Sequence, residues 1–146
     1  MGKPVIVDAA AEIPPVEHLR RFIDEGADLV TFSGGKALCG PQASSVILGA
    51  DPVLVAACAV NDGPNMSVGR GMKAGKEEIM GVVKAIELYL SRDHAADQTL
   101  WEDRVSVLLT AVGQIDGVEA WRQMPHGLGQ QIPHVAVRWE VAVVGM

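Results

Sequence analysis

The chain has 146 residues, 49% of them hydrophobic, and a formal net charge of −6 at pH 7. This length is sufficient for one domain with a buried core. The acidic balance argues against a general nucleic-acid-binding surface, which needs a basic stripe. Pro4 and Asp8 interrupt the first apolar run, so we expect neither a signal peptide nor a membrane-spanning segment, and we place the protein in the cytoplasm.

The two cysteines and four histidines show no metal-binding pattern. Cys39 and Cys58 lack the close spacing of zinc ligands and do not form a disulfide framework. We expect both to be buried thiols in a reducing compartment. No metal site is predicted.

The first 36 residues have the pattern of a β-α-β unit. An apolar run, Val5 to Asp8, precedes Pro14-Pro15 and an amphipathic segment, 16–25, which Gly26 closes. A second apolar run then ends in Ser33-Gly34-Gly35-Lys36. This order predicts two neighbouring parallel strands joined by a helix. Ligands of such sheets bind beyond the carboxyl ends of the strands.

Asp8 and Lys36 each follow one of these strands, and this combination favours pyridoxal phosphate chemistry. A lysine that bonds to an aldehyde must be neutral for part of the time, which apolar surroundings favour. A buried carboxylate would keep the pyridine nitrogen protonated. Ala10, in a run of small residues, would let a flat ring approach the chain, and Ser33 would bind the cofactor phosphate.

Simpler interpretations stand beside this one. Ser-Gly-Gly-Lys alone is also typical of a loop with a solvated lysine, and an aspartate after a strand often caps the next turn. A phosphate-binding P-loop is excluded, since the Gly-x-x-x-x-Gly-Lys-Ser/Thr spacing is absent around Lys36 and Lys76.

Three segments together resemble bacterial selenocysteine synthase (L-seryl-tRNA(Sec) selenium transferase) and its relatives such as D-glucosaminate-6-phosphate ammonia-lyase. They are Val5 to Glu12, Phe32 to Leu38, and Gly40-Pro41-Gln42-Ala43. The resemblance extends to about Leu90 and includes the segment 69–78. It implies a pyridoxal 5'-phosphate enzyme of fold type I.

The resemblance also implies roles for individual residues. Lys36 matches the Schiff-base lysine, and Asp8 matches the partner of the pyridine nitrogen. Gln42 matches a position near the cofactor and the dimer interface, and Arg70 a substrate-binding arginine. Cys39 and Ser44-Ser45 depart from the family pattern, which puts substrate contacts in doubt.

The chain is short for a complete enzyme of fold type I, and its start runs directly into a core strand. The resemblance therefore implies the C-terminal portion of such an enzyme. We expect an α/β fold, with residues 1–62 as the C-terminal part of the cofactor-binding large domain and residues 63–146 as a small α+β domain. A homo-oligomer, a dimer or larger, is expected.

Downstream patterns predict further elements. A strand over 43–49 and a short helix from Asp51-Pro52 come first, followed by a loop at 61–65. Two helices follow, one from Met72 or Lys76 and one capped by Asp97 or Thr99. Period-two alternation predicts strands at 118–122 and 135–143. The expected core stripes are Ile79, Val83, Ile86 and Leu90 on one helix and Trp101, Val105, Leu108 and Val112 on the next.

Three functions remain open. The first is a part of a pyridoxal-phosphate lyase or transferase acting on a small amino-acid substrate by elimination or related chemistry. The second is a true selenium transferase acting on seryl-tRNA, although these residues do not themselves support tRNA binding. The third is a non-catalytic α/β module that needs a partner chain.

Overall fold

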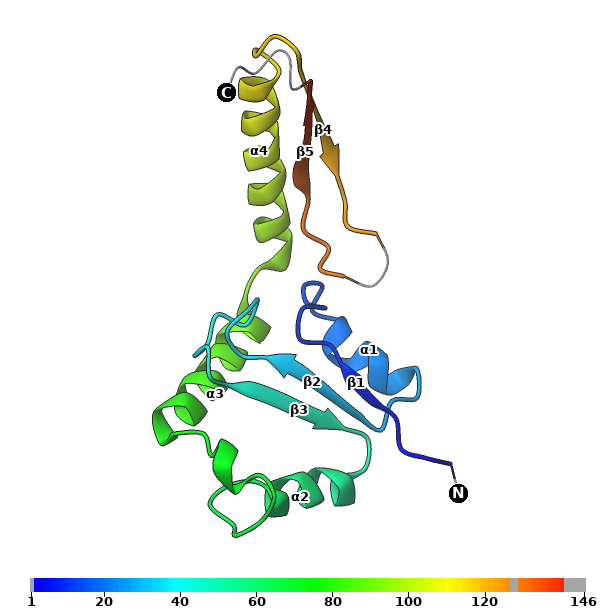
Figure 1. The fold of residues 1–146 in the computed structure, drawn as a ribbon, viewed down its shortest axis with the longest axis vertical. Helices are drawn as coiled ribbons and strands as arrows, with labels where there is room; N and C mark the ends of the chain where they lie inside the picture. The colour runs from blue at the N-terminus through cyan, green and yellow to red at the C-terminus, as the bar shows by residue number, and fades with distance from the viewer. Residues whose placement is uncertain (1, 127–128, 141–146) are drawn as a thin grey trace. The chain divides into compact units, whose positions relative to one another are not determined.

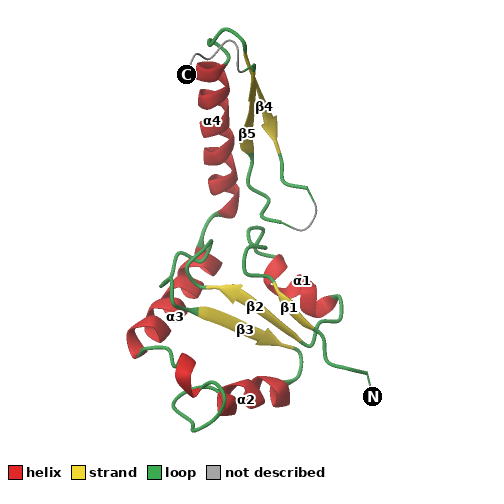
Figure 2. Cartoon of the chain, viewed as in Figure 1, coloured by secondary structure: helices red, strands yellow, loops and turns green. Residues whose placement is uncertain are grey.

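The computed structural model describes residues 2–126 and 129–140. The chain divides into two compact units between Arg92 and Asp93 (Figure 1). The first unit combines several helices with a small sheet and the second one helix with a pair of strands (Figure 2), which confirms a mixed α/β chain. The division of a complete enzyme into 1–62 and 63–146, and its fold-type I arrangement, stay predictions.

The first unit contains a three-stranded sheet in the order β1-β2-β3 (Figure 1). The strands are β1 (Ile6–Asp8), β2 (Leu29–Ser33) and β3 (Ser45–Gly49), and α1 (His18–Asp24) connects the first two. β1 and β2 are parallel, as the β-α-β pattern predicts. β3 is antiparallel to β2, with Ser33 opposite Ser45.

One face of this sheet carries the core of the unit. Val30 and Phe32 are fully buried there, and their antiparallel partners on β3 are Leu48 and Val46. Phe22 of α1 and Tyr89 pack into the same cluster. Because α1 is short and amphipathic, its burial in this cluster rather than its intrinsic propensity holds it in place.

Two further helices complete the first unit. They are α2 (Pro52–Asn61) and α3 (Lys76–Ser91), and the short 3-10 helix η1 (Arg70–Met72) lies between them. Asp51 caps α2 by accepting a hydrogen bond from the Val53 amide at 2.8 Å. Their positions agree with the predicted helices from Asp51-Pro52 and from Lys76.

The predicted core stripe of α3 is wrong at three of its four positions, whereas Ile86 is partly buried and packs against the core. Val82, Ala85 and Tyr89 are buried, whereas Ile79, Val83 and Leu90 are at least 45% exposed. Both sets have helical spacing, so periodicity alone cannot choose between them. Small residues determine which face of α3 is buried. A Cβ on Gly40 would lie 3.0 Å from the Ala85 Cβ, so the backbone at Gly40 approaches α3 closely on the Ala85 side.

The second unit consists of α4 (His94–Val112) packed on an antiparallel pair of strands, β4 (Val118–Gln123) and β5 (His134–Trp139). Asp93 caps α4 by accepting hydrogen bonds from the Ala95 and Ala96 amides. The predicted caps, Asp97 and Thr99, are therefore wrong, because helical geometry continues one turn further toward the N-terminus. The strand predicted over 135–143 is confirmed up to Trp139, and residues 141–143 lie outside the described chain.

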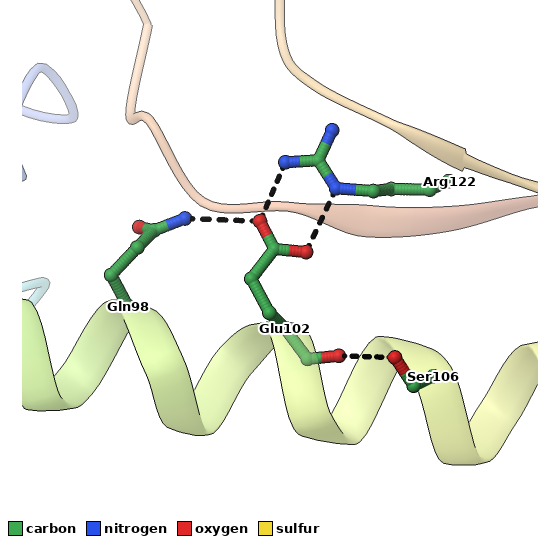
Figure 3. Close-up of polar contacts among 4 residues, drawn as sticks. All are labelled: Gln98, Glu102, Ser106 and Arg122. Atoms are coloured by element: carbon green, nitrogen blue, oxygen red, sulfur yellow. Dashed lines mark hydrogen bonds and ion pairs between the residues drawn. The ribbon is translucent and has the colours of Figure 1, made fainter.

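Of the stripe predicted for α4, only Val105 is buried, and Leu108 is 52% exposed. A polar contact holds this helix to the strands instead. Arg122 donates two hydrogen bonds to the Glu102 carboxylate, at 2.8 and 2.6 Å, and Gln98 donates a third at 3.3 Å (Figure 3). The pairing lowers the pKa of Glu102, chiefly through the hydrogen bond from Arg122.

Candidate active site

The carboxyl ends of β1 and β2 meet at one edge of the sheet, because these strands are parallel. Asp8 is the last residue of β1 and Ser33 the last residue of β2. β3 begins at this same edge with Ser45. The structure therefore brings Asp8, Ser33 and the segment that follows Ser33 to one edge, as the sequence predicts.

Asp8 has a local structural role at this edge. Its Oδ1 accepts a hydrogen bond from the Ala10 amide at 3.1 Å, and the Ala9 amide donates to the Thr31 carbonyl at 2.9 Å. The cap-like interpretation of this aspartate is thus confirmed. The other carboxylate oxygen, Oδ2, makes no hydrogen bond within the described residues, so it can still accept one from a ligand.

Lys36 lies in a compact turn, residues 34–44, between β2 and β3. One hydrogen bond joins the two ends of this turn and another lies within it: the Gly34 amide donates to the Ser44 carbonyl at 2.9 Å, and the Cys39 amide to the Lys36 carbonyl at 2.9 Å. The backbone around the lysine is therefore held by the turn itself. We call residues 34–44 the lysine turn.

Glycines allow this turn to close. A Cβ on Gly34 would lie 2.0 Å from the Ser44 Oγ, and a Cβ on Gly35 would lie 2.7 Å from the Gln42 Cα. Real Cβ atoms do not approach other atoms so closely. The Ser-Gly-Gly-Lys and Gly-Pro-Gln segments are thus two sides of one packed structure, which explains why they occur together.

Both candidate catalytic side chains are exposed in this chain. Lys36 and Asp8 are each in the exposed class, and no hydrogen-bonding or ion-pairing partner of the Lys36 amine lies within residues 2–126 and 129–140. The prediction of a buried carboxylate and apolar surroundings is therefore wrong for the chain by itself. The reason is position, since Lys36 lies in a surface turn and Asp8 on a strand that is paired on one side.

The remaining predicted residues have separate positions. Ala10 and Ser33 are partly buried beside the strand ends. Gln42 lies in the lysine turn, and its Nε2 donates to the Gly35 carbonyl at 3.0 Å. Arg70 lies outside that turn, in η1, where its Nη1 donates to the Pro64 carbonyl at 2.9 Å.

Sequence reasoning missed the contribution of Ser44, which it noted only as a departure from the family pattern. The Ser44 Oγ donates to the Pro41 carbonyl at 2.6 Å and rests against Gly34. Ser44 also borders an apolar cavity of about 630 Å³. Ile47, Val55 and Met72 are among its lining residues. The serine after Gly-Pro-Gln-Ala was the available signal, but its contacts depend on the folded turn.

Cys39 is exposed and Cys58 partly buried, so the expectation of two buried thiols is wrong. Cys39 has a positive φ of 58°, and its Sγ donates to the Ala37 carbonyl at 3.5 Å. No cluster of three potential metal-ligating side chains occurs in the described part of the chain.

The family profile of SelA, L-seryl-tRNA selenium transferase, matches residues 2–118. The chain belongs to this family. This confirms the resemblance read from Asp8, Lys36 and Gln42, and the matched range includes the whole lysine turn.

Curated relatives include proteins with different activities. The chain is 35% identical to a 5'-C-glycyluridine monooxygenase-decarboxylase of a Streptomyces species, over 99% of this chain and 34% of that protein. It is 34% identical to D-glucosaminate-6-phosphate ammonia lyase of Salmonella typhimurium, over 98% of this chain and 35% of the relative. An L-seryl-tRNA(Sec) selenium transferase of Solidesulfovibrio magneticus is 31% identical over 65% of this chain and 21% of that protein.

This SelA-family chain thus spans about a third of the length of the first two relatives. The relatives are enzymes, which places the chain in an enzymatic family. Among the described residues, no helix is long and apolar enough to cross a membrane.

Proposed function

We propose that this chain carries the lysine-bearing part of a pyridoxal-phosphate-dependent lyase or transferase of the SelA family, with Lys36 as the catalytic residue. The observation that carries the proposal is the Lys36 amine, which has no polar partner among the described residues, on a hydrogen-bonded turn at the sheet edge where Asp8 and Ser33 end their strands. The substrate class is a small amino-acid-type molecule. The working enzyme is a cytoplasmic homo-oligomer.

The residues present at this edge fit the cofactor. When bound, pyridoxal phosphate supplies an aldehyde that bonds to an amine and a ring that withdraws electrons from the substrate's α-carbon. Within the described part of the chain, the Asp8 Oδ2 accepts no hydrogen bond, so it could accept one from a protonated ring nitrogen. Ser33 offers a hydroxyl for the phosphate, and the small side chain of Ala10 leaves room for a ring.

Lys36 would do the chemical work of the chain. Its Nζ would anchor the cofactor covalently, and once released it would accept and return the proton of the substrate's α-carbon. The glycines before it add no side-chain bulk near the amine. Arg70 would bind an anionic group of the substrate with the guanidinium nitrogens that its Pro64 contact does not use.

The share of this chain that each relative matches favours one of the candidate reactions. Those matching 98–99% of this chain are named as a lyase and a monooxygenase-decarboxylase, while the selenium transferases match 65% or less. This pattern favours chemistry on a small amino-acid substrate over selenium transfer to seryl-tRNA.

The test is to titrate the purified chain with pyridoxal phosphate, reduce it with borohydride and map the modified peptide. We expect a pyridoxyl group on Lys36 that is absent from Lys36→Ala. Lys76→Ala is the matched control, because Lys76 is also exposed and also follows a glycine. Labelling at Lys76 equal to that at Lys36 would overturn the assignment.

A second candidate, a non-catalytic module that assembles with a partner chain, is favoured by the surface of α2. Nine of the ten residues of this fully described helix are apolar or proline, and none is buried. Val53 and Val60 are 71% and 64% exposed. Absence of any trapped cofactor on a folded chain, together with retention of a partner, would support this candidate.

A further inference from the structure

Three consecutive carbonyls of the lysine turn accept hydrogen bonds from within that turn. The Gly34 carbonyl accepts from the Gly40 amide at 2.8 Å, and the Lys36 carbonyl from the Cys39 amide at 2.9 Å. Between them, the Gly35 carbonyl accepts from the Gln42 side chain at 3.0 Å. Gln42 thus supplies the one side-chain donor in this set of three bonds.

We propose that Gln42 is a positioning residue, which orients Lys36 by holding the peptide between Gly35 and Lys36 and does not itself contact the cofactor. The catalytic consequence rests on the proposed function, whereas the effect on the turn does not. Gln42 also lies against Gly35, since a Cβ there would be 2.6 Å from its Oε1. Its amide is directed at the backbone of the turn.

The need for such a restraint follows from the residues before the lysine. Gly34 and Gly35 have no side chains to limit their backbone angles, so this peptide has more conformational freedom than any other dipeptide would have. The Gly35 carbonyl is the middle of the three acceptors. Without Gln42, the Gly35 carbonyl would accept hydrogen bonds from water instead. The Cα–Cβ bond of Lys36 would then lose its fixed direction relative to the sheet edge.

The decisive variant is Gln42→Glu, which keeps the shape of the side chain but at neutral pH cannot donate. Gln114→Glu is the control, because it makes the same charge change at an exposed position after α4. Amide hydrogen exchange of Cys39 and Gly40, measured by NMR on the full chain, reports the closing bonds of the turn. We expect exchange to accelerate about three- to ten-fold in Gln42→Glu and not in Gln114→Glu.

Acid should restore slow amide exchange in Gln42→Glu if Gln42 acts as a hydrogen-bond donor, but not if it acts only by packing. A protonated glutamic acid regains an O–H donor, so the exchange ratio between Gln42→Glu and the parent should return toward one as the pH falls through about 4.3. The rate at which an amine reagent labels Lys36, relative to Lys76, should also differ between Gln42→Glu and the parent chain at pH 7. Gln42→Met, which lacks the donor altogether, should behave like Gln42→Glu at pH 7 without recovering in acid.

Unchanged exchange of Cys39 and Gly40 in Gln42→Glu and Gln42→Met would overturn the proposal, as would acceleration that acid fails to reverse in Gln42→Glu. Unaltered exchange combined with weaker pyridoxal phosphate binding would instead identify Gln42 as a direct cofactor ligand. If the parent chain never traps the cofactor on Lys36, the proposed function fails, but the exchange measurement still decides the role of Gln42 in the turn.

Discussion

Arg122 of β4 and Glu102 of α4 form a two-point ion pair across 20 residues of sequence, with nitrogen–oxygen distances of 2.6 and 2.8 Å. Two of the three guanidinium nitrogens of Arg122, Nε and Nη2, and both Glu102 carboxylate oxygens take part (Figure 3). Planar two-point pairing of this kind is geometrically specific as well as favourable. It links α4 to β4 in a unit where, among the described residues, Val105 is the one hydrophobic residue in the buried set.

The pair should make the second unit sensitive to acid. The pKa of Glu102 is lowered from its ordinary value of 4.5 in the folded state, so the pair stabilises the fold fully above that value. The stabilisation is lost as the pH falls from about 4.5 through the lower folded pKa. We expect Arg122→Gln to lower the thermal midpoint by a few degrees at pH 7 and to have little effect at pH 3. Arg104→Gln, on the exposed side of α4, is the control, and an equal loss at both pH values would contradict this account.

Gly34→Ala should strain the lysine turn. The new Cβ would lie 2.0 Å from the Ser44 Oγ and 3.0 Å from the Ser44 carbonyl oxygen. We expect a loss of about 1–3 kcal/mol in the free energy of unfolding, measured with urea. Ser44→Ala should recover part of that loss in the double variant, since it removes the Oγ but leaves the carbonyl.

The control for this change is Gly71→Ala in η1, where a Cβ would meet nothing within 4 Å. Its free energy of unfolding should stay within about 0.5 kcal/mol of the parent value. Equal losses in Gly34→Ala and Gly71→Ala would show that close approach is not the reason for the glycine in the turn.

Cys39 adopts a left-handed backbone conformation, with φ at 58°. For a residue with a Cβ this conformation costs about 1 kcal/mol, and more for a β-branched side chain. We therefore expect the order of stability at this position to be glycine, cysteine, then valine, with Cys39→Val about 1–2 kcal/mol below the parent. Chemical denaturation of Cys39→Gly and Cys39→Val tests the order, and a valine variant as stable as the parent would contradict it.

Phe32→Ala should be among the most damaging single changes in the first unit. Phe32 is fully buried near the carboxyl end of β2, in the cluster that also contains Phe22 of α1 and Tyr89 of α3. Its truncation should cost about 3–5 kcal/mol. Ile6→Ala is a matched change on the neighbouring strand, where the side chain is 67% exposed, and it should cost far less. Thermal melts of the two variants with similar midpoints would refute this assignment of the core.

Local sequence patterns were sufficient for most elements of the chain. Two apolar runs, and between them an amphipathic segment closed by the glycine after residue 25, indicated β1, α1 and β2, because each signal depends on neighbouring residues. On α3, two apolar stripes have the same helical spacing, so the sequence could not indicate which of the two is buried. Tyr89 is buried in the cluster that also contains Val30 and Phe32 of β2, which lie more than 50 positions earlier in the chain.

Some features of the candidate site could be predicted from the sequence, and others depend on the tertiary structure. The sequence by itself determined that Asp8 and Lys36 follow two parallel strands and that the chain belongs with SelA-like proteins, since these depend on residue order. Only the tertiary structure decided that Gln42 donates to Gly35, that Ser44 packs on Gly34, and that Lys36 and Asp8 are exposed. Those outcomes depend on which distant backbone atoms a closed turn brings within reach, and spacing along the chain does not specify them.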